Sequence, residues 1–234
     1  MTRAFWETES PQANGRYEIK MVFNGLEAGF VKSLVLGHSL IFKPAYPTRQ
    51  VNNIYFDSVD FQLQDAHTQG SYQRFKIRLR WYHATWLVSP GFLEIKSKTG
   101  KLGQKLTRTI PQELDLTTQS WREIQASIEN ELEPKLQNLI RSTVPSLINY
   151  YQRDYYQSAD GLIRITLDTS QHAFDQRFGP RPNLTRELPI RNETILEIKA
   201  DGSRHEEIAS LLDEFPNYCS AYSKYIQGTE TMFD

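Results

Sequence analysis

Basic side chains recur at every second position along several segments of this chain. In residues 76–80, Lys76, Arg78 and Arg80 alternate with Ile77 and Leu79. Because successive side chains of a β-strand point to opposite faces, the cations would share one face and the apolar residues the other. Segments 16–20, 93–98, 163–168 and 196–199 alternate in the same way. The planar fork of arginine suits phosphate because it binds two oxygens at once.

The charged faces hold more cations than carboxylates. Four carboxylates lie on them: Glu18, Glu94, Asp168 and Glu197. The cations are Arg16, Lys20, Lys76, Arg78, Arg80, Lys96, Lys98, Arg164 and Lys199. Two like charges about 4 Å apart repel by about 4 kcal/mol at an effective dielectric constant of about 20. An open sheet with one solvated face explains the alternation, but a bound polyanion explains the imbalance better.

The four carboxylates have two possible roles. They could be ion-pair partners that orient lysine and arginine, or oxygen ligands for Mg²⁺ or Mn²⁺. Magnesium bound to phosphates typically uses one or two protein carboxylates and keeps its waters. Glu197 is the preferred metal ligand, because it shares a strand face with Lys199 near the last predicted strand.

Several function classes lack support. No phosphate-binding loop, dinucleotide fingerprint or nucleophile elbow is present, and the histidines show no metal-ligand spacing. Cys219 is the single cysteine, so no disulfide framework exists, and we interpret it as structural. The net charge of −1 gives no global field for nucleic acid, which we do not expect as a partner. No apolar run approaches the roughly 18 residues of a membrane span, so we expect a cytoplasmic protein.

The charged faces belong to strands that have helices inserted between them. Strands are predicted at 16–23, 50–57, 72–83, 91–97, 104–110, 147–157, 162–169 and 194–200. Helices are predicted at 26–38, at 59–67, from Thr117 or Thr118 to Leu139 with a break at Pro134, and at 203–215. Residues 1–15 are predicted to be a loose leader, the prolines at 44 and 47 a loop, and 171–192 a loop or hairpin edge. The tail from Tyr218 to Gly228 is unassigned. This order predicts one α+β domain over 16–234, not a doubly wound parallel sheet.

Eight short motifs, in order, carry a family resemblance. They are RYEIK at 16–20, NNIYFD at 52–57, KIRLRWY at 76–82, LEIKSK at 93–98, YYQRDYY at 150–156, RITLD at 164–168, LEIK at 196–199 and YSKYIQG at 222–228. In this order they resemble the VTC domain, the polyphosphate polymerase branch of the CYTH and triphosphate tunnel superfamily. The resemblance implies an eight-stranded antiparallel closed β-tunnel with a charged interior and helices packed outside.

The resemblance also implies a site. Arg78, Arg80, Arg153 and Arg164 would clamp the transferred phosphoryl group, and Lys20, Lys96, Tyr151, Lys199 and Lys224 would bind the rest of the phosphate chain. Glu197 matches a metal-binding glutamate, for Mn²⁺ or Mg²⁺, and Lys105 or Arg108 would add a contact. One departure is Arg16, which stands where the wider superfamily has the first glutamate of E-x-E-x-K; this agrees with the VTC branch.

The implied activity is transfer of the terminal phosphoryl group of ATP, or another nucleoside triphosphate, onto polyphosphate. Two alternatives stay open: a tripolyphosphatase of the same fold, and a non-catalytic polyphosphate-binding module. The sequence does not decide between them, and it gives no oligomeric state.

Overall fold

The computed structural model describes residues 16–24, 28–100, 102–191, 193–201, 203–216 and 223–232. The predicted leader 1–15 and Cys219 lie outside this part of the chain. The strands are β1 (Arg16–Phe23), β2 (Lys43–Asp57), β3 (Gln73–Tyr82), β4 (Leu87–Val88), β5 (Gly91–Thr99), β6 (Leu102–Ile110), β7 (Leu114–Asp115), β8 (Val144–Gln157), β9 (Ile163–Asp175) and β10 (Thr194–Asp201). The helices are α1 (Ala28–Leu36), α2 (Gln62–Thr68), α3 (Trp121–Asn130), α4 (Pro134–Arg141), α5 (His205–Asp213) and α6 (Lys224–Glu230). Among the described helices, none has the length and apolarity needed to cross a membrane.

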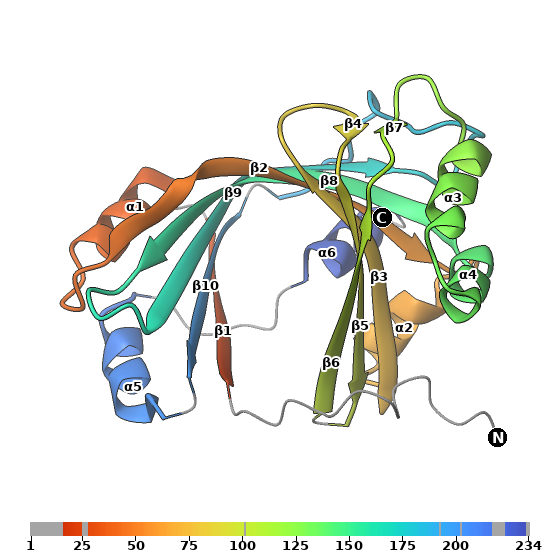
Figure 1. Ribbon diagram of the computed structural model, residues 1–234. Helices are drawn as coiled ribbons and strands as arrows, with labels where there is room; N and C mark the ends of the chain where they lie inside the picture. The colour runs from red at the N-terminus through yellow and green to blue at the C-terminus, as the bar shows by residue number, and fades with distance from the viewer. Residues whose placement is uncertain are drawn as a thin grey trace.

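One antiparallel sheet carries all the charged segments. Its strand order is β1-β10-β9-β8-β2-β3-β5-β6. The sheet curls into an arch, or half-barrel, in which β10 and β1 form one arm and β3, β5 and β6 form the other (Figure 1). The predicted eight-stranded antiparallel α+β fold is therefore confirmed. In the described residues, β1 and β6 are the sheet edges and do not pair, so the curl of the sheet rather than a closed ladder encloses the concave face.

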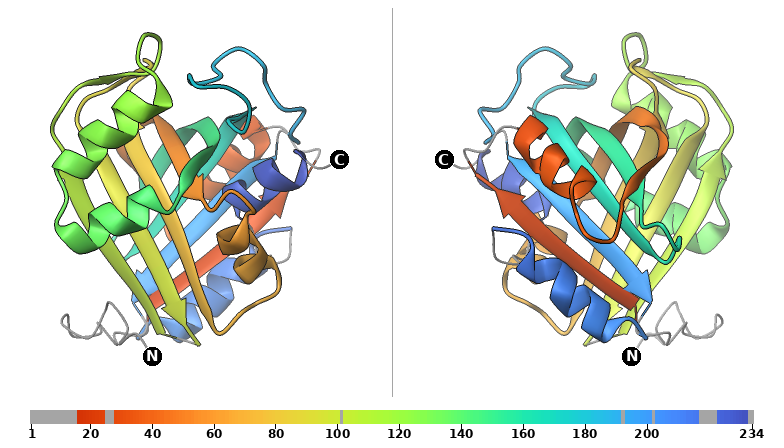
Figure 2. Two further views of the ribbon diagram at one scale, coloured as in Figure 1. Left: turned by 90° about the vertical axis from the view of Figure 1, so that its right-hand side faces the viewer. Right: turned by 90° about the vertical axis from the view of Figure 1, so that its left-hand side faces the viewer.

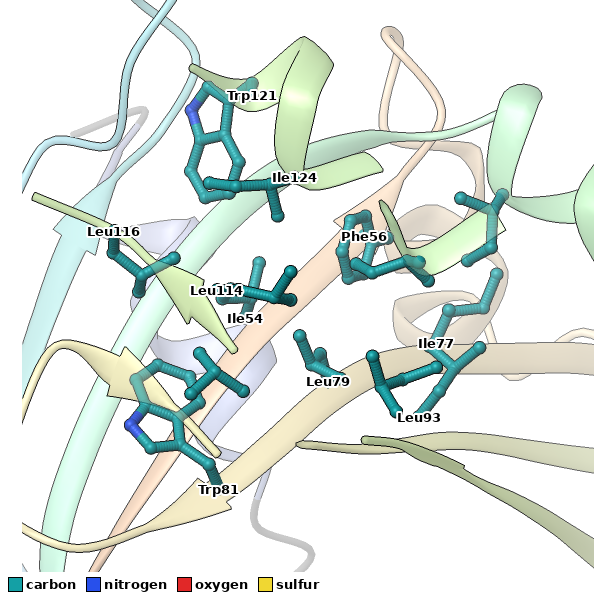
Figure 3. Packing of buried hydrophobic residues seen from close by; sticks show 14 of the residues in the cluster. Ile54, Phe56, Ile77, Leu79, Trp81, Leu93, Leu114, Leu116, Trp121 and Ile124 are labelled. Carbon is teal, nitrogen blue, oxygen red and sulfur yellow. The ribbon is translucent and has the colours of Figure 1, made fainter. Parts of the chain in front are cut away.

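Apolar residues on the convex side pack against helices and fix the direction of the charged side chains. Ile77 and Leu79 of β3 belong to a buried cluster that also contains Trp121 and Ile124 of α3 (Figure 3). On the other arm, a second cluster joins residues of β9 and β10 to α1 and α5, which lie outside the sheet (Figure 2). Because alternate side chains of a strand point to opposite faces, the charged residues point into the arch.

The long strand β2 joins the two arms and extends beyond its prediction. Pro44 and Pro47, predicted in a loop, lie within β2, whose ladder with β8 shifts register between Pro44 and Tyr46 and again between Tyr46 and Arg49. Proline is tolerated in sheets at such irregularities because no ladder hydrogen bond is lost there. The predicted break at Pro134 is confirmed, since α4 begins at that residue.

Two further boundaries differ from the prediction. Helix α3 is capped by Ser120 in a capping box with Glu123, not by Thr117 or Thr118. Strand β9 continues to Asp175, through an irregularity opposite Tyr151 where Ser170 has a φ of 50°. The predicted loop therefore begins later than residue 171.

Helix α6, which the sequence left unassigned, lies on the concave side of the arch (Figure 1). Tyr225 stacks on Tyr55 of β2, with 4.7 Å between ring centroids, and its hydroxyl donates a hydrogen bond to Asp57. Gly228 packs directly on Leu147 of β8. Helices α1, α3, α4 and α5 pack outside the sheet as expected, whereas α6, which carries no sequence-based assignment, packs on its concave side.

Candidate functional site

The arm formed by β3, β5 and β6 holds its cations around one buried carboxylate. Arg78 faces Glu94 in the β3–β5 ladder and donates to it at 2.5–2.6 Å through Nη2 and Nε. Lys105 of β6 reaches the other carboxylate oxygen at 2.6 Å, and Arg80 Nη1 lies 3.9 Å from it. Burial opposes the charged form of Glu94, but these cations outweigh it and lower its pKa to about 2. Glu94 therefore acts as the ion-pair partner that orients this arm.

A second buried carboxylate organises the roof of the arch. Arg153 of β8 binds Asp168 of β9 through two hydrogen bonds, of 2.5 and 2.7 Å, and Lys224 of α6 reaches the same carboxylate at 2.6 Å. The ring of buried Tyr151 lies beneath both cations, 5.3 Å from Arg153 Cζ and 4.5 Å from Lys224 Nζ. Burial opposes the charge of Asp168, yet Lys224 and Arg153 lower its pKa. Asp168 is thus the ion-pair partner of the predicted phosphate ligands.

The third carboxylate group lies where β1 pairs with β10. Glu197 is 8% exposed, with Lys199 Nζ 3.4 Å and Arg153 Nη2 3.9 Å from its carboxylate. Lys20 is its partner residue in the ladder and lies 3.5 Å from Glu18. Burial opposes the charge of Glu197, but Lys199, a hydrogen bond with the Glu18 side chain, and Lys20 together lower its pKa. Lys20 and Lys199 each lie within ion-pair distance of one of these two carboxylates.

The oxygen atoms around Glu197 fit a divalent cation. Besides Glu18, the hydroxyl of Thr166 lies next to Glu197 in the β9–β10 ladder, and it is buried with no hydrogen-bond partner among the described residues. Carboxylates and hydroxyls are the hard oxygen ligands that Mg²⁺ and Mn²⁺ take. In the part of the chain that the structure describes, no group of three or more His, Cys, Asp or Glu side chains is arranged for a metal. The remaining ligands would therefore come from water and phosphate.

Lysines on the two arms face each other across the arch. Lys76 donates to Ser223 at 2.9 Å, and burial together with the charges of Lys20 and Lys96 lowers its pKa to about 7. For Lys96, partial desolvation on the concave face and the charge of Arg78 lower the pKa to about 8, and the opposite arm adds the charge of Lys199. Lys76 and Lys20 also line a cavity of about 1020 Å³ beside α2 and α6. A polyanion entering this space would relieve the repulsion.

The structure resolves the two residues whose register the sequence left open. Lys105 lies on the concave face with Glu94, whereas Arg108 pairs with Glu133 at 3.0 Å, next to α4 on the convex side. Arg164 is exposed near the start of β9, where it lies opposite Lys199 in the β9–β10 ladder. It precedes Asp168 by four residues on the same strand. Sequence reasoning missed Arg49, which faces Arg153 in the β2–β8 ladder, because residues before 50 were assigned to a loop.

Fold and site together define an antiparallel half-barrel whose concave face carries cations held by buried carboxylates. The VTC domain model matches residues 15–233, and the chain therefore belongs to the VTC domain family. Among curated proteins, no sequence matches this chain.

Solved structures of low sequence identity share the fold. A putative adenylyl cyclase from Hippeastrum, reported to reveal a dominant triphosphatase activity, has a TM-score of 0.51 and 15% identity, over 92% of this chain and 96% of its own. A putative adenylate cyclase from Bacillus halodurans has a TM-score of 0.53 and 16% identity, over 91% and 97%. A further putative adenylate cyclase, from Vibrio parahaemolyticus, has a TM-score of 0.51 and 14% identity, over 95% and 100%. These likenesses show the fold alone.

Proposed function

We propose that this protein is a polyphosphate polymerase that transfers the terminal phosphoryl group of ATP, or another nucleoside triphosphate, onto polyphosphate. The observation that carries the proposal is the convergence of Arg78, Arg80, Arg153 and Lys224 on one concave face, where buried carboxylates hold them in place. Phosphoryl transfer requires mainly positioning and charge stabilisation from the protein, and this arrangement supplies both.

In this proposal the arginines act on the transferred group. Arg78, Arg80, Arg153 and Arg164 clamp its oxygens, while Lys20, Lys96, Lys199, Lys224 and Tyr151 hold the rest of the donor and the acceptor chain. The bond between the β-phosphate and the γ-phosphate breaks, and a terminal oxygen of polyphosphate forms the new bond to phosphorus. The nucleoside diphosphate leaves with the electron pair of the broken bond. Because Glu94 and Asp168 hold the guanidinium groups before substrate arrives, little reorganisation is needed in the transition state.

The proposed metal site is Glu197 with Glu18. A divalent cation bound there would neutralise charge on the phosphate oxygens and help to align them. Glu94 and Asp168 are not part of this proposal, because their oxygens already accept hydrogen bonds from Arg78, Lys105, Arg153 and Lys224.

The experiment is incubation of the purified protein with ATP and Mn²⁺, followed by assay for polyphosphate and for ADP. The proposal predicts polymer and ADP in matching amounts. Release of phosphate without polymer would refute the polymerase and leave the tripolyphosphatase of the same fold, in which water takes the place of the acceptor chain.

Two arginine variants test whether the concave face is responsible. Arg80→Ala removes one clamp residue, and we expect its turnover to fall about 100-fold or more, as for loss of a preorganised charge donor. Arg108→Ala is the matched control, since this arginine lies on the same sheet but points to the convex side, where it pairs with Glu133. Equal losses in both variants would contradict the proposed site.

Calorimetry with polyphosphate separates catalysis from binding alone. We expect Mn²⁺ to strengthen binding to the wild type and to have little effect on Glu197→Ala. Binding that is independent of metal in both proteins, without turnover, would instead indicate a non-catalytic polyphosphate-binding module.

A further inference from the structure

An arginine surrounded by aromatic rings lies at one end of the concave face. The guanidinium carbon of Arg49 is 5.3 Å from the ring centroid of Tyr46, 5.4 Å from that of Tyr155 and 5.9 Å from that of Tyr82. Phe92 packs beside Tyr82, with 6.2 Å between ring centroids. We call these five residues, from β2, β3, β5 and β8, the aromatic cluster.

The strand registers place this cluster on the same face as the phosphate ligands. Arg49 pairs with Arg153, and Tyr46 pairs with Tyr155, which follows Arg153 by two residues on β8. On the arm formed by β3, β5 and β6, Tyr82 follows Arg80 by two residues, and Phe92 pairs with Arg80. Two residues of strand span roughly 7 Å. The aromatic cluster therefore begins one strand repeat beyond the arginines, both on the roof strands β2 and β8 and on the arm that contains β3.

The two ends of the concave face differ in chemistry. Along β3 and β5, the opposite end carries Lys76 and Lys98, which line the cavity beside α2 and α6. The aromatic end is accessible to solvent, since Tyr46 is 58% exposed and Arg49 is also exposed. Among the described residues, no carboxylate forms a salt bridge with Arg49, in contrast to Arg78 and Arg153. A set of rings that is exposed at Tyr46 and half-buried at Tyr82, Phe92 and Tyr155, with an arginine among them, is a surface on which a flat aromatic ligand can stack.

We infer that the aromatic cluster binds the nucleoside of the triphosphate donor. The inference rests on the proposed function, because it requires that the phosphates of the donor lie along Arg80 and Arg153. The base stacks on the accessible faces of these rings, and the ribose spans the strand repeat between the rings and the arginines. Arg49 covers the base or contacts the phosphate nearest the ribose. Stacking uses the flat face of the base, so the site accepts any common nucleobase.

The same asymmetry gives the donor a direction. With its nucleoside at the aromatic end, the donor points its terminal phosphate toward the lysine-lined cavity. Inorganic tripolyphosphate has the same phosphates but no nucleoside, so it does not use the aromatic cluster. The difference between these two ligands isolates the contribution of the cluster.

The test compares ATP and inorganic tripolyphosphate on three variants. Tyr155→Ala removes a central ring, and Tyr46→Ala removes the most exposed one, whose loss is least able to affect folding. Phe178→Ala is the matched control, because Phe178 is 75% exposed and stacks with Arg177 in the loop after β9, away from the cluster. Calorimetry with Mn²⁺ gives the dissociation constant of each ligand, and kinetics give KM and kcat for ATP.

We expect the two tyrosine variants to bind ATP about tenfold more weakly, the loss of one stacked base. Their affinity for tripolyphosphate should change less than twofold, which also shows that they are folded. Phe178→Ala should match the wild type with both ligands, and GTP and UTP should behave like ATP.

Two outcomes would overturn the inference. If ATP and tripolyphosphate weaken equally, the cluster contributes to phosphate binding or to the fold and not to a nucleoside site. If neither changes, the cluster does not contact the donor. Because these are binding measurements, an effect selective for ATP in a protein that makes no polymer would support the nucleoside site while refuting the polymerase.

Discussion

The protonation of Lys76 provides a quantitative test of the concave face as an anion site. Burial and the neighbouring charges of Lys20 and Lys96 lower its pKa to about 7. A phosphate chain bound beside Lys76 would stabilise the charged ammonium and raise this pKa toward the ordinary lysine value. We therefore predict that binding of a triphosphate takes up protons from the solution.

The size of the uptake follows from the two shifted lysines. At roughly pH 8, a lysine with a pKa of about 7 is about one tenth protonated, so restoring its charge takes up ~0.9 proton. Lys96, with a pKa of about 8, contributes ~0.5 proton at the same pH. The expected total is ~1.4 protons, and these lysines contribute only ~0.1 at about pH 6, where both are already charged. Calorimetric titration with tripolyphosphate, in buffers of different ionisation enthalpy, measures the net proton exchange of protein and ligand, and comparison with a variant that lacks Lys76 isolates the contribution of this lysine.

Lys76→Met is the matched variant, because it keeps a side chain of similar length without the titrating group. Its uptake near pH 8 should fall to at most that of Lys96 alone, ~0.5 proton, because loss of the Lys76 charge can only raise the pKa of Lys96. Uptake equal to that of the wild type would refute the reasoning.

The lowered pKa of Lys76 also makes the free energy of unfolding depend on pH. Between about pH 7 and pH 10.5, the unfolded state binds the proton of Lys76 and the folded state does not. The contribution of Lys76 to the free energy of unfolding therefore rises with pH across this window, in the ligand-free protein.

Two further predictions concern the roof of the arch. Asp168→Asn removes the buried partner of Arg153, and we expect a loss of about 3–5 kcal/mol in the free energy of unfolding, measured by denaturant titration; a loss below about 1 kcal/mol would show that this ion pair is dispensable. Gly228→Ala places a Cβ only 2.6 Å from Leu147 Cδ2, and we expect a cost of about 1–3 kcal/mol and a lower melting temperature. Gly29→Ala is its control, because nothing lies within 4 Å of the added carbon and the change should be neutral or stabilising.

The charged concave face could be predicted because it depends on local periodicity. A strand alternates its faces whatever its partners are, so the cations of 76–80 had to lie opposite Ile77 and Leu79. The ordered motifs placed these strands in a family, and the match over 15–233 confirms it. The helix break at Pro134 was equally local, because proline lacks the donor that a helix interior requires.

Other features depended on which strands lie side by side. Alternation alone could not show that Glu94 and Asp168 are enclosed by cations, because their partners come from neighbouring strands and from α6. The aromatic cluster was missed for a related reason. Arg49 follows two prolines that predict a loop, and only the irregular ladder between β2 and β8 places it beside Arg153.

The sequence by itself therefore determined the chemistry of the faces, through residue types at a spacing of two, and the family, through the order of its motifs. The tertiary structure alone decided how the sheet curls around that face and which side chains from other elements reach it. The curl of the sheet brings Lys76 toward the lysines of the opposite arm, and α6 carries Lys224 inside the arch. These contacts join residues far apart in the chain, and no periodicity within one segment can specify them.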